Sequence, residues 1–290
     1  MSNYKIETKC IQSGYEPGNG EPRQIPIIQS TTFKYSTSED MGKLFDLEAS
    51  GYFYTRLQNP TNDHVAAKIA AMEGGTAAML TSSGQAANFF AIFNICESGD
   101  HIVASSSIYG GTFNLIAVTL AKMGITATFV SPDASEEELN AAFRPNTKLM
   151  FGETIANPAL TVLDIELFAK TAHAHGVPLI IDNTFPTPVN CRPFEWGADI
   201  VTHSTTKYMD GHGAAVVGHL GRDGVGSREL RHLGGGVADE PVLAGVGGVG
   251  VDEVGAGAVV VHQRHGVGPL AGGILLGGVP GQVILAVYAA

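Results

Sequence analysis

The feature that most constrains the fold is a regular alternation of short apolar runs with longer segments of helical pattern between residues 60 and 217. The short runs predict strands, and the longer segments predict helices of about ten residues. This alternation is typical of an α/β fold with a mostly parallel sheet covered by helices on both faces. The predicted strands are 77–82, 101–105, 125–130, 147–153, 178–183 and 198–204, and the predicted helices are 60–73, 84–96, 112–124, 135–143 and 164–176.

Two other segments flank this region. Residues 1–60 are rich in Gly, Pro, Gln and aromatic side chains without clear periodicity, so we expect an N-terminal arm that contributes to a partner subunit. Residues 61–217 form the predicted large domain. Residues 218–290 hold 20 of the 37 glycines of the chain and no lysine. Because glycine adds to the entropy cost of ordering and offers no side chain to pack, we do not expect a native domain there.

Composition excludes several classes of function. The net charge of −11 argues against a partner that is nucleic acid or an anionic membrane surface. Cys10, Cys96 and Cys191 are scattered and odd in number, which argues against a zinc site or a disulfide framework. The N-terminus shows no secretory signal, and no apolar run reaches the roughly 18 residues of a membrane span. We therefore expect a cytoplasmic protein with no metal.

Polar residues follow several predicted strands, where ligands bind in parallel sheets. They are Ser82 to Gly84, Glu153, Asp182 with Asn183, and Ser204. The Ser83-Gly84 turn precedes a predicted helix, whose free backbone N–H groups suit a phosphate. Many strand–helix turns share this pattern, so it is weak by itself.

The segment THSTTKY places Lys207 after a strand and a run of hydroxyls. Hydroxyls there can hold a phosphate and the amine can form a Schiff base, although a surface lysine after a Ser/Thr-rich turn would look the same. Asp182 ends a buried strand about 25 residues earlier. A buried carboxylate needs a partner. The pyridine N–H of pyridoxal phosphate (PLP) is one such partner, and the following turn is the alternative.

Taken together, six segments resemble the Cys/Met-metabolism family of PLP-dependent enzymes, which includes cystathionine synthases and lyases, methionine γ-lyases and O-acetylhomoserine sulfhydrylases. The segments are YFYTRLQNPTN, EGGTAAMLTSSGQAANFF, YGGTFNL, ETIANP, IIDNTFPTP and ADIVTHSTTKYMDGHG. They follow the family's order and spacing up to about residue 217. The resemblance implies the PLP-dependent transferase fold of type I.

The resemblance also implies a role for each matching residue. Lys207 would carry the cofactor, Asp182 would pair with the pyridine nitrogen, and Tyr109 would stack on the ring. Asn157 would lie near the phenolic oxygen. The phosphate would be bound by a set of backbone and side-chain groups from Ser83, Gly84, Gln85, Ser204 and Thr206. Tyr54 and Arg56 would reach the phosphate of the neighbouring subunit, which implies a homo-oligomer, expected to be a dimer of dimers.

Within the family the chain looks most like O-acetylhomoserine sulfhydrylase. Methionine γ-lyases typically carry a cysteine after YG, where this chain has Gly111. The resemblance implies replacement of acetate on O-acetylhomoserine by sulfide or methanethiol, in methionine biosynthesis and transsulfuration. A cystathionine or methionine γ-lyase activity is the alternative within the family.

The resemblance ends near Val217, and the family's C-terminal domain, which supplies an arginine for the substrate carboxylate, has no counterpart. None of Arg222, Arg228, Arg231 and Arg264 lies in a family motif. A frameshifted or truncated gene product is our hypothesis, and an inactive protein that still binds PLP is a second alternative. The pattern Gly245-x-Gly247-x-x-Gly250 resembles a dinucleotide-binding turn, but it is expected by chance in so glycine-rich a segment.

Overall fold

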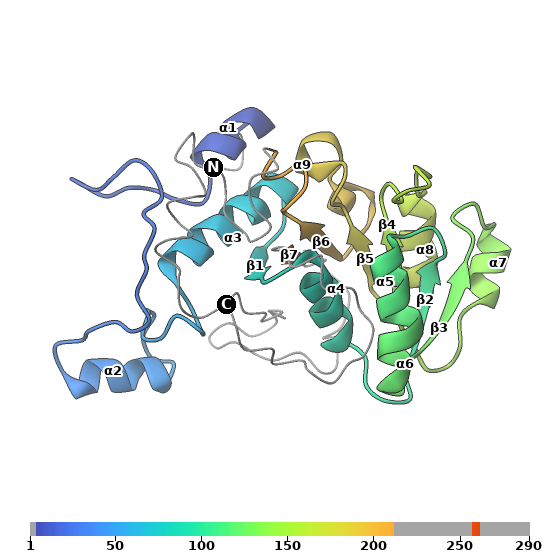
Figure 1. Cartoon of the computed structure of the whole chain (residues 1–290), viewed down its shortest axis with the longest axis horizontal. Helices are drawn as coiled ribbons and strands as arrows, with labels where there is room; N and C mark the ends of the chain where they lie inside the picture. Colours follow the sequence, from blue (N-terminus) through green and yellow to red (C-terminus); the bar gives the residue numbers. More distant parts are fainter. Residues whose placement is uncertain (1–3, 212–256, 262–290) are drawn as a thin grey trace.

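The structure is a computed structural model that describes residues 4–211 and 257–261. Its centre is a seven-stranded sheet with the order β1-β7-β6-β5-β4-β2-β3 (Figure 1). Every pair from β3 to β6 is parallel, and only β7 runs opposite to its neighbours. The strands are β1 (Ala77–Thr81), β2 (His101–Ser105), β3 (Thr126–Val130), β4 (Thr147–Glu153), β5 (Leu179–Asp182), β6 (Ile200–Ser204) and β7 (Gly257–Val261). The predicted mostly parallel sheet is confirmed.

The central strands are apolar on both faces because each face packs against helices. Ile180 and Ile181 are neighbours on β5 but belong to two separate buried clusters. One cluster contains residues of α4 (Gly84–Phe93), and the other contains residues of α3 (Pro60–Glu73) and α8 (Ile165–Ala174). We call these sides of the sheet the α4 face and the α3 face. Helices thus cover both faces, as the alternating pattern predicted.

Local signals account for the helix ends. The Asn59 side chain accepts a hydrogen bond from the backbone N–H of Thr61, and Pro60 occupies the first turn of α3. The helix ends at Gly74, whose φ of 77° lies in the left-handed region that favours glycine. The predicted capping box at the start of α7 (Glu136–Ala141) is present, since Ser135 and Glu138 each accept a hydrogen bond from the other's backbone.

The predicted helix 112–124 is a composite. It consists of α5 (Gly110–Asn114), a π-helical stretch η1 (Leu115–Thr119) and α6 (Leu120–Lys122). Its buried residues Ile116 and Leu120 join the cluster on the α4 face. The π-helical stretch inserts wider turns without ending the helix, which a periodicity argument does not distinguish from a continuous α-helix.

The N-terminal arm contains more regular structure than we expected. It includes α1 (Ile6–Gln12), which contacts α3, and α2 (Ser38–Phe45), which is capped by Thr37 and lies away from the sheet (Figure 1). Two short helices, α9 (Thr187–Asn190) and η2 (Pro193–Trp196), connect β5 to β6. No helix in the described part of the chain is long and apolar enough to cross a membrane.

Five residues of the glycine-rich segment form β7, between β1 and β6. The rest of the predicted tail, including the pattern at 245–250 and the four arginines from Arg222 on, lies outside the described residues. The division into an arm, a large domain and a tail stays a prediction.

Candidate functional site

Three neighbouring strands bring their carboxyl ends together at one edge of the sheet. Glu153 at the end of β4 is opposite Asp182 at the end of β5, and Asp182 is opposite Thr202 on β6. Side chains alternate along a strand, so these three residues share the α4 face with Ser204. The polar strand ends singled out in the sequence are therefore adjacent in space.

Asp182 is nearly buried, with 8% of its surface exposed, and its carboxylate is held by three donors. Oδ1 accepts hydrogen bonds from the backbone N–H of Thr184 at 3.1 Å and from the Thr184 hydroxyl at 2.5 Å. Oδ2 accepts from the side-chain amide of Asn88 at 3.0 Å. The Thr184 hydroxyl also accepts from the backbone N–H of Ser204 at 2.8 Å, which ties the ends of β5 and β6 together.

Asn88 lies on α4, and both its amide nitrogen and its amide oxygen are hydrogen-bonded. Its Oδ1 accepts from the Thr202 hydroxyl at 2.5 Å, and its amide also donates to the Thr112 hydroxyl at 3.1 Å. The side chain of Gln85 donates to the same Thr112 oxygen at 3.0 Å. We did not identify Asn88, Thr112, Thr184 or Thr202 as site residues from the sequence. The available signal was spacing, since Asn88 lies one helical turn after Gly84 and therefore on the same side of the helix.

The start of α4 approaches the end of β6 very closely. A Cβ atom added to Gly84 would lie 2.7 Å from the Cβ of Ser204, so only glycine fits. The Ser83 hydroxyl caps the helix by accepting the N–H of Ala86 at 2.9 Å. The hydroxyl of Thr206 is buried and has no hydrogen-bond partner among the described residues. A helix N-terminus packed against Ser204, with an unpartnered buried hydroxyl two residues further along the chain, fits an anion such as a phosphate.

Tyr109 is positioned through its backbone. Its N–H donates to Glu153 Oε2 at 2.5 Å. Glu153 is 4% exposed, and burial, with a further contribution from the negative charge of Asp182, raises its pKa to about 8 against the opposing effect of the Tyr109 hydrogen bond. The Tyr109 ring lies over Gly111, where an added Cβ atom would be 2.5 Å from Cε1 of the ring.

Lys207 lies in the turn that follows β6, at the same edge of the sheet. Its backbone N–H donates to the Ser204 carbonyl at 3.3 Å, and its side chain is exposed. Asn157 is half-buried in the loop after β4. The structure thus brings Ser83, Gly84, Gln85, Asp182, Ser204, Thr206 and Lys207 to the ends of the strands around α4.

Tyr54 and Arg56 belong to the segment between α2 and α3. The Arg56 guanidinium lies 5.0 Å from the centre of the Tyr54 ring, and Tyr54 pairs with Thr32 in an isolated β-bridge. These contacts are local to the arm. Their role at the site of a neighbouring subunit stays a prediction.

A second polar cluster lies at the carboxyl ends of the same strands, on the α3 face. Glu73 Oε1 is 2.6 Å from Nε2 of His203 and accepts from the Asn183 amide at 3.1 Å. Asn183 in turn accepts from the Thr154 hydroxyl at 2.9 Å. The side chains of Glu73 and His203 have no exposed surface. We call these four residues the Glu73 cluster.

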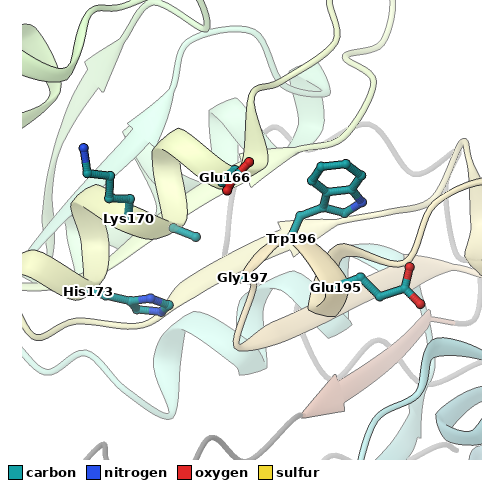
Figure 2. Close-up of a pocket in the computed structure, with 7 residues that line it drawn as sticks. Glu166, Lys170, His173, Glu195, Trp196 and Gly197 are labelled. Carbon is teal, nitrogen blue, oxygen red and sulfur yellow. The ribbon is translucent and has the colours of Figure 1, made fainter.

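One surface cavity lies elsewhere, and Figure 2 shows its lining. Its volume is about 360 Å³, and its walls are the α8 residues Glu166, Ala169, Lys170 and His173 with Glu195, Trp196 and Gly197 from the η2 turn. None of the predicted site residues lines it. Among the described residues, no group of three or more His, Cys, Asp or Glu side chains could hold a metal ion.

Comparison with known proteins agrees with this geometry. Residues 7–235 match the model of the Cys/Met metabolism PLP-dependent enzyme family. The chain is 44% identical over 217 residues to an O-acetyl-L-homoserine sulfhydrylase of Leptospira meyeri, covering 74% of this chain and 49% of the relative. It is 47% identical over 196 residues to an L-methionine gamma-lyase of Porphyromonas gingivalis, covering 67% and 49%. The chain thus spans about half the length of these curated relatives.

Solved structures show the same fold. An O-acetylhomoserine (thiol)-lyase of Campylobacter jejuni, which carries N'-pyridoxyl-lysine-5'-monophosphate, matches with a TM-score of 0.73 and 30% identity over 90% of this chain and 54% of its own. A cystathionine gamma-lyase of Lactobacillus plantarum in complex with L-serine matches with a TM-score of 0.69 and 31% identity over 90% and 55%. The resemblance and the PLP-dependent fold predicted from the sequence are therefore confirmed, and this chain belongs to the Cys/Met metabolism family of PLP-dependent enzymes.

Proposed function

We propose that the edge of the sheet around Asp182 and Lys207 binds PLP and catalyses γ-replacement on O-acetylhomoserine with sulfide or methanethiol. The observation that carries the proposal is the Asp182 carboxylate, which is nearly buried and held by three donors at the strand end beside the Lys207 turn. A carboxylate fixed in this way suits a cationic N–H, and the family's cofactor contains one in its pyridine ring.

The residues present fit this cofactor. The start of α4 and the unpartnered hydroxyl of Thr206 would hold the phosphate, with Ser83, Gly84, Gln85 and Ser204 around it. Tyr109, held by Glu153, would cover the ring, and Asn157 would lie near its phenolic oxygen. Tyr54 and Arg56 of a neighbouring subunit would complete the phosphate site, which requires a homo-oligomer. PLP supplies an electron sink for carbanions next to the substrate amine.

The protein contributes attachment, orientation and proton transfer. Lys207 Nζ would hold the cofactor until the substrate amine displaces it, and would then take the proton from the substrate Cα. Asp182 would keep the pyridine nitrogen protonated. Lys207 is suited to both tasks because its side chain is exposed at the site edge while its backbone is fixed to Ser204. Loss of acetate from Cγ and addition of the sulfur nucleophile there would give homocysteine or methionine.

The relatives support the sulfhydrylase assignment and leave a lyase open. Curated relatives include sulfhydrylases, a homocysteine synthase of Schizosaccharomyces pombe at 44% identity, and methionine gamma-lyases. The close contact between Gly111 and the Tyr109 ring favours the sulfhydrylase over a lyase with cysteine at that position. A protein that binds PLP without turnover is the second candidate, since the chain spans only about half of its relatives.

The first experiment is the visible absorbance of the purified chain mixed with PLP. We expect a yellow protein-bound band that is lost in Lys207→Ala and retained in Lys170→Ala, which removes an exposed lysine paired with Glu136 on another part of the surface. Absence of the band from the unchanged chain would contradict cofactor binding.

Turnover is then measured with O-acetylhomoserine and sulfide. Homocysteine formation by the PLP-loaded chain supports the sulfhydrylase. Release of 2-oxobutyrate without added sulfide supports a lyase, and a bound band without either product supports the inactive alternative.

A further inference from the structure

We infer that Asn88 is a positioning residue for the cofactor: its amide fixes the Asp182 carboxylate in the orientation that pairs with the pyridine nitrogen, and Thr202 fixes the amide. The inference rests on the proposed function. It deepens that function by assigning a role to two buried residues that contact no reacting atom. It starts from the 3.0 Å hydrogen bond between Asn88 Nδ2 and Asp182 Oδ2.

The orientation of the Asn88 amide is determined by its neighbours. An ionised carboxylate can only accept hydrogen bonds, so the NH₂ group must face Asp182. The Thr202 hydroxyl then donates to Asn88 Oδ1 at 2.5 Å. A flipped amide would place its oxygen against the Asp182 carboxylate, whereas the hydroxyls of Thr112 and Thr202 can each donate or accept and so suit either orientation. The contact with Asp182 therefore specifies the orientation, and the two hydroxyls hold it.

Burial makes these contacts strong. Asn88 and Thr202 are 1% and 0% exposed, so water cannot replace a lost partner. A hydrogen bond to a charged group contributes more than a neutral one, and an unpaired buried donor carries its full desolvation cost. Asp182 is consequently held in place by α4 as well as by its own strand.

The donors are divided unequally between the two carboxylate oxygens. Oδ1 accepts two hydrogen bonds from Thr184, whereas Oδ2 accepts one from Asn88. Each carboxylate oxygen can accept about two. Oδ2 is thus the oxygen with capacity for one more donor, and Asn88 is the residue that orients it.

The first test exchanges the two side chains. Asn88→Asp keeps the shape of the side chain but places a second carboxylate about 3 Å from Asp182. In the double variant Asn88→Asp with Asp182→Asn, one amide and one carboxylate face each other again, and Thr202 and Thr184 can still donate. Without cofactor, at pH 8, we expect Asn88→Asp to lower the urea midpoint of unfolding and the double variant to recover it.

PLP affinity, measured by the protein-bound absorbance band, is expected to respond differently from the unfolding midpoint. Asn88→Asp should weaken binding about 10- to 100-fold. The double variant should not recover affinity, because its charge lies on α4 and no longer on β5. The matched control is Asn183→Asp, another fully buried amide at the end of β5 that faces Glu73. It should lower the unfolding midpoint but leave PLP affinity within about three-fold.

Thr202 provides the second test. Thr202→Val removes the hydroxyl without changing the volume, and we expect PLP affinity to fall by about 5- to 10-fold. Thr202→Ser retains the hydroxyl and should restore affinity. If the exchange of Asn88 and Asp182 recovers no stability, or if Val and Ser at position 202 bind PLP equally well, the positioning role is wrong. If the unchanged chain binds no PLP, the proposed function is wrong. The urea midpoints of Asn88→Asp and of the double variant still show whether Asn88 holds Asp182.

Discussion

At the ends of β5 and β6, the α4 face of the sheet carries Asp182 and Thr202, and the α3 face carries their sequence neighbours Asn183 and His203. Both pairs are buried, and each pair contacts one helical side chain. On the α4 face, the helical partner is the neutral Asn88 and the charge stays on the strand. On the α3 face, the helical partner is the acid Glu73, which is enclosed with His203.

The two faces of the same strand ends differ in what they expose. The Asp182 carboxylate has room for a further donor and is 8% exposed, so it can interact with a ligand. In the Glu73 cluster, Glu73 and His203 have no exposed side-chain surface, so the cluster can only connect α3 to β5 and β6. We therefore expect changes on the α3 face to affect stability alone, and changes on the α4 face to affect cofactor chemistry as well.

The largest effect on stability is expected for His203→Ala. Removing the imidazole leaves the Glu73 carboxylate buried beside an empty space, and breaking a buried pair in this way costs about 3–5 kcal/mol. Urea unfolding monitored by circular dichroism measures the loss. PLP affinity of the folded fraction should be unchanged, and a selective loss of affinity without loss of stability would contradict the division between the faces.

Asp182→Asn is the corresponding change of a buried polar side chain on the α4 face. The amide is similar in shape but no longer carries the charge that would keep the pyridine nitrogen protonated, so turnover by the PLP-loaded protein should fall by about 100-fold or more. The unfolding midpoint should also fall, because Thr184 can still donate to the remaining oxygen but the new NH₂ group then faces the NH₂ group of Asn88. Turnover is therefore compared per amount of folded, PLP-loaded protein. Turnover close to that of the unchanged chain would show that Asp182 is not the cofactor's partner.

Gly84→Ala examines the close contact between α4 and β6. The new methyl group would lie 2.7 Å from Ser204 Cβ and 3.0 Å from its Cα, so the start of the helix must shift. We expect PLP affinity to fall by about ten-fold, because the backbone groups proposed to bind the phosphate shift with it. Gly42→Ala on α2 is the control, since an added Cβ there meets nothing within 4 Å. It should leave affinity unchanged and slightly stabilise the chain.

The smallest effect for a single step of the measurement is the change in stability per pH unit. The pKa of folded Glu153 is raised from 4.5 to about 8, so the folded state holds a proton that the unfolded state releases. The stability linked to this proton is complete below pH 4.5 and is lost as the pH rises to about 8. Between these values, the unfolding free energy of the cofactor-free chain, relative to Glu153→Gln, should fall by up to about 1.4 kcal/mol per pH unit. A constant difference would mean that Glu153 is ionised throughout.

Much of this architecture was predictable because it depends on local patterns. Strand β2 and strand β4 were predicted at their observed bounds, and Asp182 and Ser204 were expected at strand ends, where the structure has them. Their roles at the site, and that of Lys207, stay predictions. The helix α2 was missed, although Thr37 with acidic residues in the next turn is an N-cap signal.

The partners of the buried polar side chains were not predictable in the same way. Asn88 and Asp182 are 94 residues apart, and Glu73 and His203 are 130 residues apart. Periodicity can place each residue on a face of its own element, but it does not specify which faces meet or how a side-chain amide is turned. The sequence therefore indicated the charged residue and left its supporting residues unidentified.

Strand β7 has a consequence for the order in which the protein can assemble. Among the described strands, β1 pairs with β7 alone, so it has no described sheet partner until Gly257–Val261 has been synthesised. On a translating ribosome, β2 to β6 can pair as they emerge, whereas β1 must wait for about 180 further residues. The Gly84 turn that follows β1 is therefore expected to join Ser204 only after Gly257–Val261 has been synthesised.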